Sequence, residues 1–301
     1  MAVALPEKYE PYRRMVEAWL TQYLESWESR AQVPNRLMDA VRYSLLAPGK
    51  RIRPILTLLT AECCNGIPEK ALPAAAAVEM IHAYSLVHDD LPAMDDDALR
   101  RGRPTCHIAF DEGTAILAGD ALLTLAFQVL AEEITPEPLA ASCLREVSMA
   151  AGWAGMVGGQ MDDLLMESNQ SGTLKQLISI HRRKTGALLQ ASVLLGWRIA
   201  QFAQPDTSVH AALCEYADNL GLAFQIADDL LDVQSSSQAL GKATQKDASQ
   251  GKLTYPGLLG VDGARRELQM ALQKGVAALE PLYLNTQPLV DVLHYVVNRD
   301  K

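Results

Sequence analysis

Helix-breaking residues recur along this chain at helix-length intervals, and this spacing restricts the fold more than any other feature. The breakers include Pro34-Asn35, Pro48-Gly49, Asn65-Gly66, Pro92, Pro136, Pro205-Asp206 and Pro256-Gly257. The segments between them are rich in helix formers, and none alternates apolar and polar residues for long enough to predict a strand. Because globular helices usually span about 8 to 20 residues, the pattern predicts an all-α bundle of roughly ten helices.

Two segments carry specific signs of a helix start. Residues 73–91 begin with Pro73, a residue favoured in the first helical turn, and continue with a run of alanines. From Thr173 onward, leucine and isoleucine recur near helical spacing, and Thr173 is placed to cap the first turn. We expect both segments to be helical.

The chain shows no internal division. No linker rich in Gly, Ser or Pro is visible, and neither is a repeat of about 20 to 50 residues. At 301 residues and 49% apolar composition, the chain is long enough to build one large core. We therefore expect residues 1–301 to form a single domain.

Charge and cysteine content exclude several classes of protein. The formal net charge of -9 disfavours nucleic acid as a partner, because duplex binding depends on Lys and Arg that neutralise phosphates. The five cysteines are odd in number and lack C-x-x-C spacing, which argues against a disulfide framework and a zinc ribbon. A reducing compartment fits this cysteine usage best.

No segment has the pattern of a signal peptide or a membrane span. The N-terminus carries Glu7, Lys8 and Glu10, where a signal peptide needs apolar residues. The most apolar stretch, residues 115–131, contains Asp120. We expect a cytoplasmic protein without stable membrane insertion.

Two clusters of aspartate indicate a metal site. Five of the nine residues 89–97 are carboxylates, and a second cluster reads Asp228-Asp229-x-x-Asp232. A lone Asp cluster is most often a solvated turn, but both of these follow apolar helical segments. Unit charges about 4 Å apart repel by roughly 4 kcal/mol at an effective dielectric of about 20, so such clusters need compensation. Oxygen-only ligation suits Mg²⁺ that bridges to substrate phosphates.

The spacing within the two clusters differs. Asp228 and Asp232 are one helical turn apart and therefore face the same way. Asp89 and Asp95 are about 240° apart on an ideal helix. Pro92 lies between them and disfavours helical geometry at the residue before it. We expect the chain to leave the helix here and to bring Asp95 back towards Asp89.

Basic clusters accompany the acidic ones. They are Lys50-Arg51-x-Arg53, Arg100-Arg101-x-Arg103, Arg182-Arg183-Lys184, and Lys242 with Lys246 and Lys252. Any one of them alone is more often a solubilising surface, but together in an acidic protein they favour a phosphate or diphosphate ligand. His82 lies two helical turns before Asp89 and is compatible with either anion binding or a buried core position.

These motifs, in this order, resemble those of the trans-isoprenyl diphosphate synthases, and most closely the bacterial short-chain farnesyl diphosphate synthases. The resemblance covers nearly the whole chain. The matching motifs are Gly49-Lys50-Arg51-x-Arg53-Pro54, Asp89-Asp90-x4-Asp95 with Arg100-Arg101-Gly102, Gly158-Gly159-Gln160 with Asp163-Leu164, Lys184-Thr185-Gly186, Phe224-Gln225-Ile226-x-Asp228-Asp229-x-x-Asp232, Gly241-Lys242 and Gly251-Lys252.

The resemblance implies the isoprenoid synthase fold, a helical bundle around a central active-site cavity, and a homodimer. It implies three Mg²⁺ ions with the allylic diphosphate bound, Mn²⁺ being an alternative. The implied metal ligands are Asp89, Asp95 and Asp228, supported by Asp90, Asp229 and Asp232. The implied allylic-site residues are Arg100, Lys184, Thr185, Gln225, Lys242 and Lys252. Those implied for isopentenyl diphosphate are Lys50, Arg53, His82 and Arg101, and the basic Arg299 and Lys301 resemble a tail that closes over the site.

The activity implied is the condensation of dimethylallyl or geranyl diphosphate with isopentenyl diphosphate to farnesyl diphosphate, in which Asp89, Asp95, Asp228, Arg100 and Lys184 carry the chemistry. Ionisation is followed by condensation and loss of a proton, for which the departing diphosphate is the family's usual base. Tyr84 and Ser85, just before the first motif, resemble the residues that set product length in farnesyl synthases. Ordinary core packing is the alternative role for Tyr84.

One position departs from the pattern. Pro48 stands where many relatives have a second glycine before Gly49-Lys50-Arg51. Because proline fixes φ near about -65°, the loop must adopt a compatible turn. We expect the shape of this loop to differ, and Lys50 and Arg53 to keep their roles.

Several alternatives remain at this point. A geranyl or geranylgeranyl diphosphate synthase differs only in product length. A class I terpene cyclase shares an aspartate motif but needs no isopentenyl site, and a non-catalytic prenyltransferase subunit commonly lacks one aspartate motif. A di-iron bundle is prompted by Glu79-x-x-His82, but that fold needs a second Glu-x-x-His, which this chain lacks.

Overall fold

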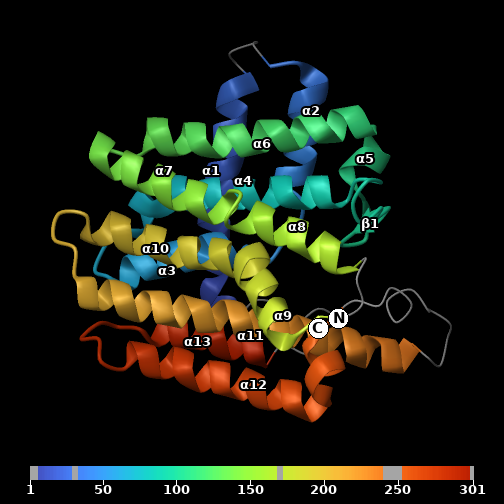
Figure 1. The fold of residues 1–301 in the computed structure, drawn as a ribbon. Coiled ribbons are helices and arrows are strands. Elements are labelled where there is room, and N and C mark those ends of the chain that lie inside the picture. Colours follow the sequence, from blue (N-terminus) through green and yellow to red (C-terminus); the bar gives the residue numbers. More distant parts are fainter. Residues whose placement is uncertain (1–5, 29–32, 168–171, 240–252, 299–301) are drawn as a thin grey trace.

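The computed structural model describes residues 6–28, 33–167, 172–239 and 253–298, and Figure 1 shows them as a bundle of helices. The helices are η1 (Glu7–Tyr9), α1 (Glu10–Glu28), α2 (Asn35–Leu45), α3 (Ile52–Cys63), η2 (Pro68–Ala71), α4 (Leu72–Asp89), α5 (Cys106–Ala109), α6 (Glu112–Glu133), α7 (Glu137–Ala151), α8 (Met156–Glu167), α9 (Leu174–His181), η3 (Arg182–Gly186), α10 (Ala187–Gln201), α11 (Thr207–Ala239), α12 (Tyr255–Leu279) and α13 (Gln287–Val297). The strands are β1 (Leu99–Arg100) and β2 (Arg103–Pro104). The all-α prediction is confirmed.

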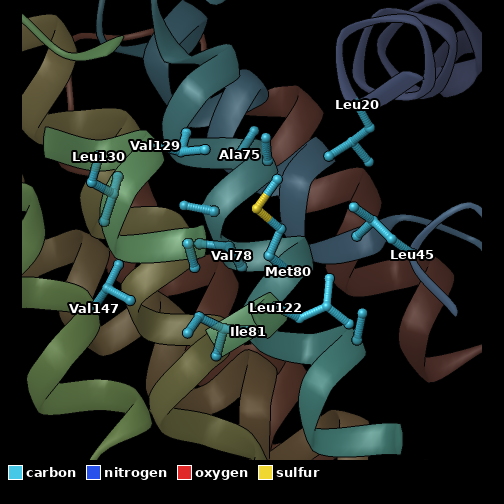
Figure 2. Close-up of a cluster of buried hydrophobic side chains, with 14 of the residues drawn as sticks. Leu20, Leu45, Ala75, Val78, Met80, Ile81, Leu122, Val129, Leu130 and Val147 are labelled. Atoms are coloured by element: carbon cyan, nitrogen blue, oxygen red, sulfur yellow. The ribbon is translucent and has the colours of Figure 1, made fainter. Parts of the chain in front are cut away.

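Helix α4 lies at the centre of one of two hydrophobic clusters. It packs against α6, α3, α10, α1 and α2, and nearly every residue from Pro73 to Ala83 is buried. Its alanines let these neighbours approach closely, while Met80 and Ile81 fill the space towards Leu122 of α6 (Figure 2). A helix that is apolar on all sides is typical of a buried core position.

The second hydrophobic cluster surrounds α11. This helix packs on α12, α10 and α13, and Figure 1 shows α11, α12 and α13 side by side at the bottom of the view. Tyr216 of α11 is completely buried, and its hydroxyl donates to the Leu289 carbonyl of α13 at 2.7 Å. Tyr12 of α1 packs against both clusters.

Both helix starts expected from the sequence are present. Helix α4 has Pro73 in its first turn and ends at Asp89, two residues earlier than the expected range. Thr173 caps α9 in a reciprocal capping box with Gln176, whose backbone N–H donates to the Thr173 hydroxyl at 3.3 Å.

The short hairpin of β1 and β2 was not predicted. Arg100 pairs with Arg103, which leaves Arg101 and Gly102 as a two-residue turn. Both turn residues have positive φ, 54° and 76°, as a type I′ turn requires. Two-residue strands are too short to produce a period-two pattern, so the sequence carried no strand signal here.

Helix α6 is long and apolar enough to cross a membrane by length and composition alone. In the structure it instead packs against α4, α2 and α7 of the bundle, and 44% of its most apolar window is buried. These contacts are those of a core helix.

Candidate active site

The first aspartate cluster lies at the point where α4 ends. Asp89 is the last helical residue, and the backbone N–H of Asp95 donates to its carbonyl at 2.9 Å. Asp96 has a positive φ of 52°, which helps to turn the chain. The predicted departure from the helix around Pro92, with Asp95 returning to Asp89, is confirmed for the backbone.

The second aspartate of this cluster binds an arginine. Asp90 is buried, and its Oδ1 accepts from Nε of Arg100 at 2.6 Å, while Asp97 lies 3.7 Å from the same guanidinium. Burial raises the pKa of the Asp90 carboxyl, and the Arg100 charge partly offsets that rise. Asp90 therefore holds Arg100 in place beside the cluster.

The β1–β2 hairpin presents the arginines to the site. Its tight turn brings Arg101 to the loop before α3, where Arg101 Nη1 donates to the Pro48 carbonyl at 2.6 Å. A Cβ on Gly49 would lie 2.3 Å from the same nitrogen, so a larger residue here would displace the Arg101 guanidinium. The loop with the unusual Pro48 therefore still packs against Arg101.

A buried ion pair fixes the other end of this loop. Arg51 has a left-handed backbone, and its Nη1 donates to Oε1 of Glu79 at 2.5 Å. Its Nη2 donates to the Ala47 carbonyl at 2.8 Å. Both side chains are at most 5% exposed, so the Glu79 carboxylate needs the Arg51 charge, while Arg51 also lies 3.7 Å from Glu17. This accounts for Glu79, whose spacing from His82 had suggested a di-iron motif.

His82 lies among arginines. Burial is the largest cause that lowers the pKa of its imidazole well below 6.5, and the positive charges of Arg53, Arg101, Arg100 and Arg51 lower it further. The ring is therefore neutral at pH 7, in a strongly positive environment. Such a cluster of charges with one neutral donor is suited to a polyanion.

Arg53 and Lys50 connect this region to the second half of the bundle. The Arg53 guanidinium lies 6.0 Å from the ring centroid of Phe224 on α11. Burial lowers the pKa of Arg53, whereas the charges of Glu79 and Asp228 raise it. Lys50 Nζ lies 5.8 Å from the ring centroid of Tyr295 on α13. The first basic cluster therefore faces the helix that carries the second aspartate cluster.

The second aspartate cluster lies on α11. Asp228 is half-buried and Asp232, one turn later, is exposed. Asp229 is buried, and its Oδ2 accepts from the backbone N–H of Tyr255 at the start of α12, at 2.9 Å. The N-terminus of α12 is the positive end of its helix dipole, which favours a carboxylate there. The second aspartate of each cluster, Asp90 in the first and Asp229 in the second, thus has a protein partner.

Lys184 and Thr185 lie in the π-helix η3, between α9 and α10. Lys184 Nζ donates to Oδ2 of Asp163 on α8 at 2.7 Å, and Thr185 and Gln225 are half-buried. A Cβ on Gly159 would lie 2.3 Å from the Lys184 backbone nitrogen, so α8 contacts η3 directly. Single π turns of this kind are frequent at functional sites.

Helix α8 also reaches the first aspartate cluster. Gln160 Nε2 donates to Oδ1 of Asp89 at 2.6 Å. The sequence had placed Gln160 and Asp163 in a motif without assigning either a role, because the spacing between distant segments does not show which side chains meet.

The donor set fits magnesium. Among the described residues, no three His, Cys, Asp or Glu side chains are close enough to hold an ion by themselves. Mg²⁺ is usually bound by one or two carboxylates together with water and substrate phosphates. Carboxylates on α11 and at the end of α4, with arginines beside them, match that mode of binding, because the substrate would supply the remaining ligands.

The residues expected to set product length lie on two faces of α4. Ser85 is half-buried one turn before Asp89, and its hydroxyl donates to the His82 carbonyl at 2.9 Å. Tyr84 is about 140° away from Asp89 on an ideal helix. It is buried, with its ring edge-on to His88 at 5.8 Å between centroids. Its role in product length stays a prediction.

Four residues assigned from the resemblance fall outside the described part of the chain. They are Lys242, Lys252, Arg299 and Lys301.

Comparison with known proteins shows which family the chain resembles along its length. Residues 34–280 match the family model described as polyprenyl synthetase. The chain is 44% identical over 276 residues to a farnesyl diphosphate synthase of Haemophilus influenzae, covering 91% of this chain and 92% of the relative. It is 45% identical over 271 residues to a geranylgeranyl diphosphate synthase of Cyanophora paradoxa, covering 89% of each. A solved geranyltransferase from Legionella pneumophila superposes with a TM-score of 0.85 at 33% identity, covering 97% of this chain and 96% of that chain.

Proposed function

The chain belongs to the polyprenyl synthetase family and is a short-chain prenyltransferase, and we propose that its product is farnesyl diphosphate. Farnesyl diphosphate synthases predominate among the similar proteins. A geranylgeranyl diphosphate synthase of similar identity makes that longer product the second candidate. The observation that carries the proposal is a pocket lined by His82, Asp90, Arg100 and Arg101, directly beside Asp89 at the end of α4.

The proposed metal ligands are Asp89, Asp95 and Asp228. Their support is that the backbone brings Asp95 back to Asp89, and that the negative charge of Asp228 acts on Arg53 of the first basic cluster. Magnesium bound there would neutralise the allylic diphosphate and make it a better leaving group.

The proposed substrate-binding residues form two sites. Six residues, four of them basic, would bind the allylic diphosphate: Arg100, Lys184, Thr185, Gln225, Lys242 and Lys252. Lys50, Arg53, His82 and Arg101 would bind isopentenyl diphosphate. The positive charges that surround neutral His82 support the second assignment, because a diphosphate would remove the repulsion between those arginines.

These residues would act by stabilising charge. Cleavage of the allylic C–O bond leaves a delocalised cation and an anion, so cationic side chains held near the leaving group lower the barrier. Asp163 holds Lys184, and Asp90 holds Arg100, before substrate arrives. These two cations therefore need less rearrangement when the diphosphate binds. The isopentenyl double bond would attack the cation, and the released diphosphate would take the proton, so that no side-chain base is required.

Purified protein is expected to convert dimethylallyl and isopentenyl diphosphates to a C15 diphosphate in the presence of Mg²⁺. EDTA should stop the reaction, and excess Mg²⁺ should restore it. Product length is measured by chromatography after dephosphorylation. A C20 product would favour the geranylgeranyl alternative, and no condensation with ample metal and both substrates would contradict the prenyltransferase assignment.

Tyr84→Ala is expected to yield longer products than the wild type. Removing a buried ring opens space below the first aspartate cluster, if this ring ends the cavity. Product length is measured under the same assay conditions. Tyr283→Ala is a control that removes an exposed aromatic ring between α12 and α13. An unchanged C15 product from Tyr84→Ala would leave core packing as its role.

We propose further that the chain is a single cytoplasmic domain that forms a homodimer. The packing of Tyr12 against both hydrophobic clusters supports one domain. Exposed apolar side chains on α6, on α7 and just after α7 support self-association: Ile116 is 45% exposed, Leu117 59%, Met149 70% and Trp153 91%.

A further inference from the structure

Gln160 links α8 to the first aspartate cluster. Its Nε2 lies 2.6 Å from Oδ1 of Asp89, the shorter end of the range for a hydrogen bond to a charged acceptor. The two residues are far apart in sequence, and both are half-buried. A contact of this length limits how the Asp89 carboxylate can rotate.

In this hydrogen bond the Gln160 side-chain amide donates and the Asp89 carboxylate accepts. An ionised carboxylate only accepts hydrogen bonds, so the amide nitrogen of Gln160 must face it. The bond occupies one lone pair of Oδ1 and restricts the rotation of the carboxylate. A neutral donor does this without adding a charge that would compete with the metal.

Helix α8 packs closely against η3. Adding a Cβ to Gly158 would place it 1.9 Å from the Trp153 carbonyl oxygen, and adding one to Gly159 would place it 2.3 Å from the Lys184 nitrogen. One turn beyond Gln160, on the same face, Asp163 accepts from Lys184 at 2.7 Å. The backbone of Gln160 is therefore set by close packing before any ligand arrives.

We infer that Gln160 is a positioning residue that fixes the Asp89 carboxylate in the orientation needed for metal binding. This inference rests on the proposed function, in which Asp89 is a metal ligand. Partners that orient a ligand are often worth about 10–100-fold in metal affinity or activity. The structure supplies such a partner to Asp89 from a different helix.

The test is direct metal binding by Gln160→Met, which keeps the length of the side chain and removes the donor. Binding of Mn²⁺ is followed by electron paramagnetic resonance in the presence of dimethylallyl S-thiolodiphosphate, an unreactive analogue. We expect binding about 10–100-fold weaker than that of wild type. The KM for isopentenyl diphosphate should stay within about twofold, because Gln160 contacts Asp89, which lies about two helical turns from His82 on α4.

Two further variants separate positioning from a general structural effect. Gln160→His keeps an N–H donor and should recover part of the lost affinity. Gln273→Met makes the same chemical change at an exposed position of α12 and should bind Mn²⁺ as wild type does. Thermal melting by circular dichroism shows whether Gln160→Met is folded.

Equal Mn²⁺ affinity in Gln160→Met and wild type would overturn the inference. So would a Gln160→Met protein whose affinity falls only together with its melting temperature and its KM for isopentenyl diphosphate, since that pattern indicates structural damage. The proposed function is tested separately. An inactive wild type would refute it, whereas an active wild type with metal affinity equal to that of Gln160→Met would refute this inference alone.

Discussion

Asp89→Asn is expected to lower kcat by about a thousand-fold under the proposed function. The substitution keeps the shape of the side chain and removes the negative charge of a proposed metal ligand. Charge stabilisation by a bound metal supplies several kcal/mol, and about 4 kcal/mol corresponds to about a thousand-fold in rate. The rate is measured at saturating dimethylallyl and isopentenyl diphosphates over a range of Mg²⁺ concentrations.

Asp96→Asn is the matched control for this variant. Asp96 is in the same acidic segment, is exposed, and has a left-handed backbone that asparagine tolerates. Its kcat should remain within about threefold of wild type, as expected for an exposed surface substitution. If Asp89→Asn lost less than about tenfold in kcat, Asp89 would not be a metal ligand in the transition state.

Arg51→Met is expected to destabilise the protein by about 3–5 kcal/mol, because it leaves the Glu79 carboxylate buried without its partner. The side chains of Arg51 and Glu79 are 3% and 5% exposed, so water cannot replace the lost contact. For a chain of this size the melting temperature should fall by on the order of 10 °C. Thermal and urea unfolding followed by circular dichroism measure both quantities.

The double variant Arg51→Met/Glu79→Leu should be more stable than Arg51→Met, because it removes both buried charges. Arg14→Met is the control on α1. Its side chain is 75% exposed and pairs with Glu10 at 3.3 Å, and such pairs contribute at most about 1 kcal/mol. A loss of less than about 1 kcal/mol in the free energy of unfolding of Arg51→Met would show that the buried pair does not stabilise the fold more than a surface pair does.

Local features were predictable because their causes lie within a few residues. The capping of α9 by Thr173 needs only the residues of one turn. The chain leaves the helix before Pro92 as expected, although α4 ends two residues earlier than the expected range, and the return of Asp95 follows from the short spacer. The supporting roles of Asp90 and Asp229 came from the resemblance, and their bonds to Arg100 and Tyr255 are consistent with them.

Contacts between distant segments were not predictable. A glutamate within the apolar sequence of α4 signals that a buried charge needs a partner, but nothing local identifies Arg51 as that partner. The hairpin that presents Arg100 and Arg101 is too short to produce a strand pattern. The contact of Gln160 with Asp89 depends on α8 packing against η3 through its glycines.

By itself, the sequence determined the helical class of this protein, the starts of two of its helices, and the ordered motifs that identify its family. Helix propensity, capping and proline geometry act over a few residues, so they can be read along the chain. Only the tertiary structure decided which group holds three of these aspartates: the Arg100 guanidinium for Asp90, the Tyr255 backbone N–H for Asp229 and the Gln160 side-chain amide for Asp89. These partners depend on how helices distant in sequence pack together, and close packing of the whole bundle sets that arrangement.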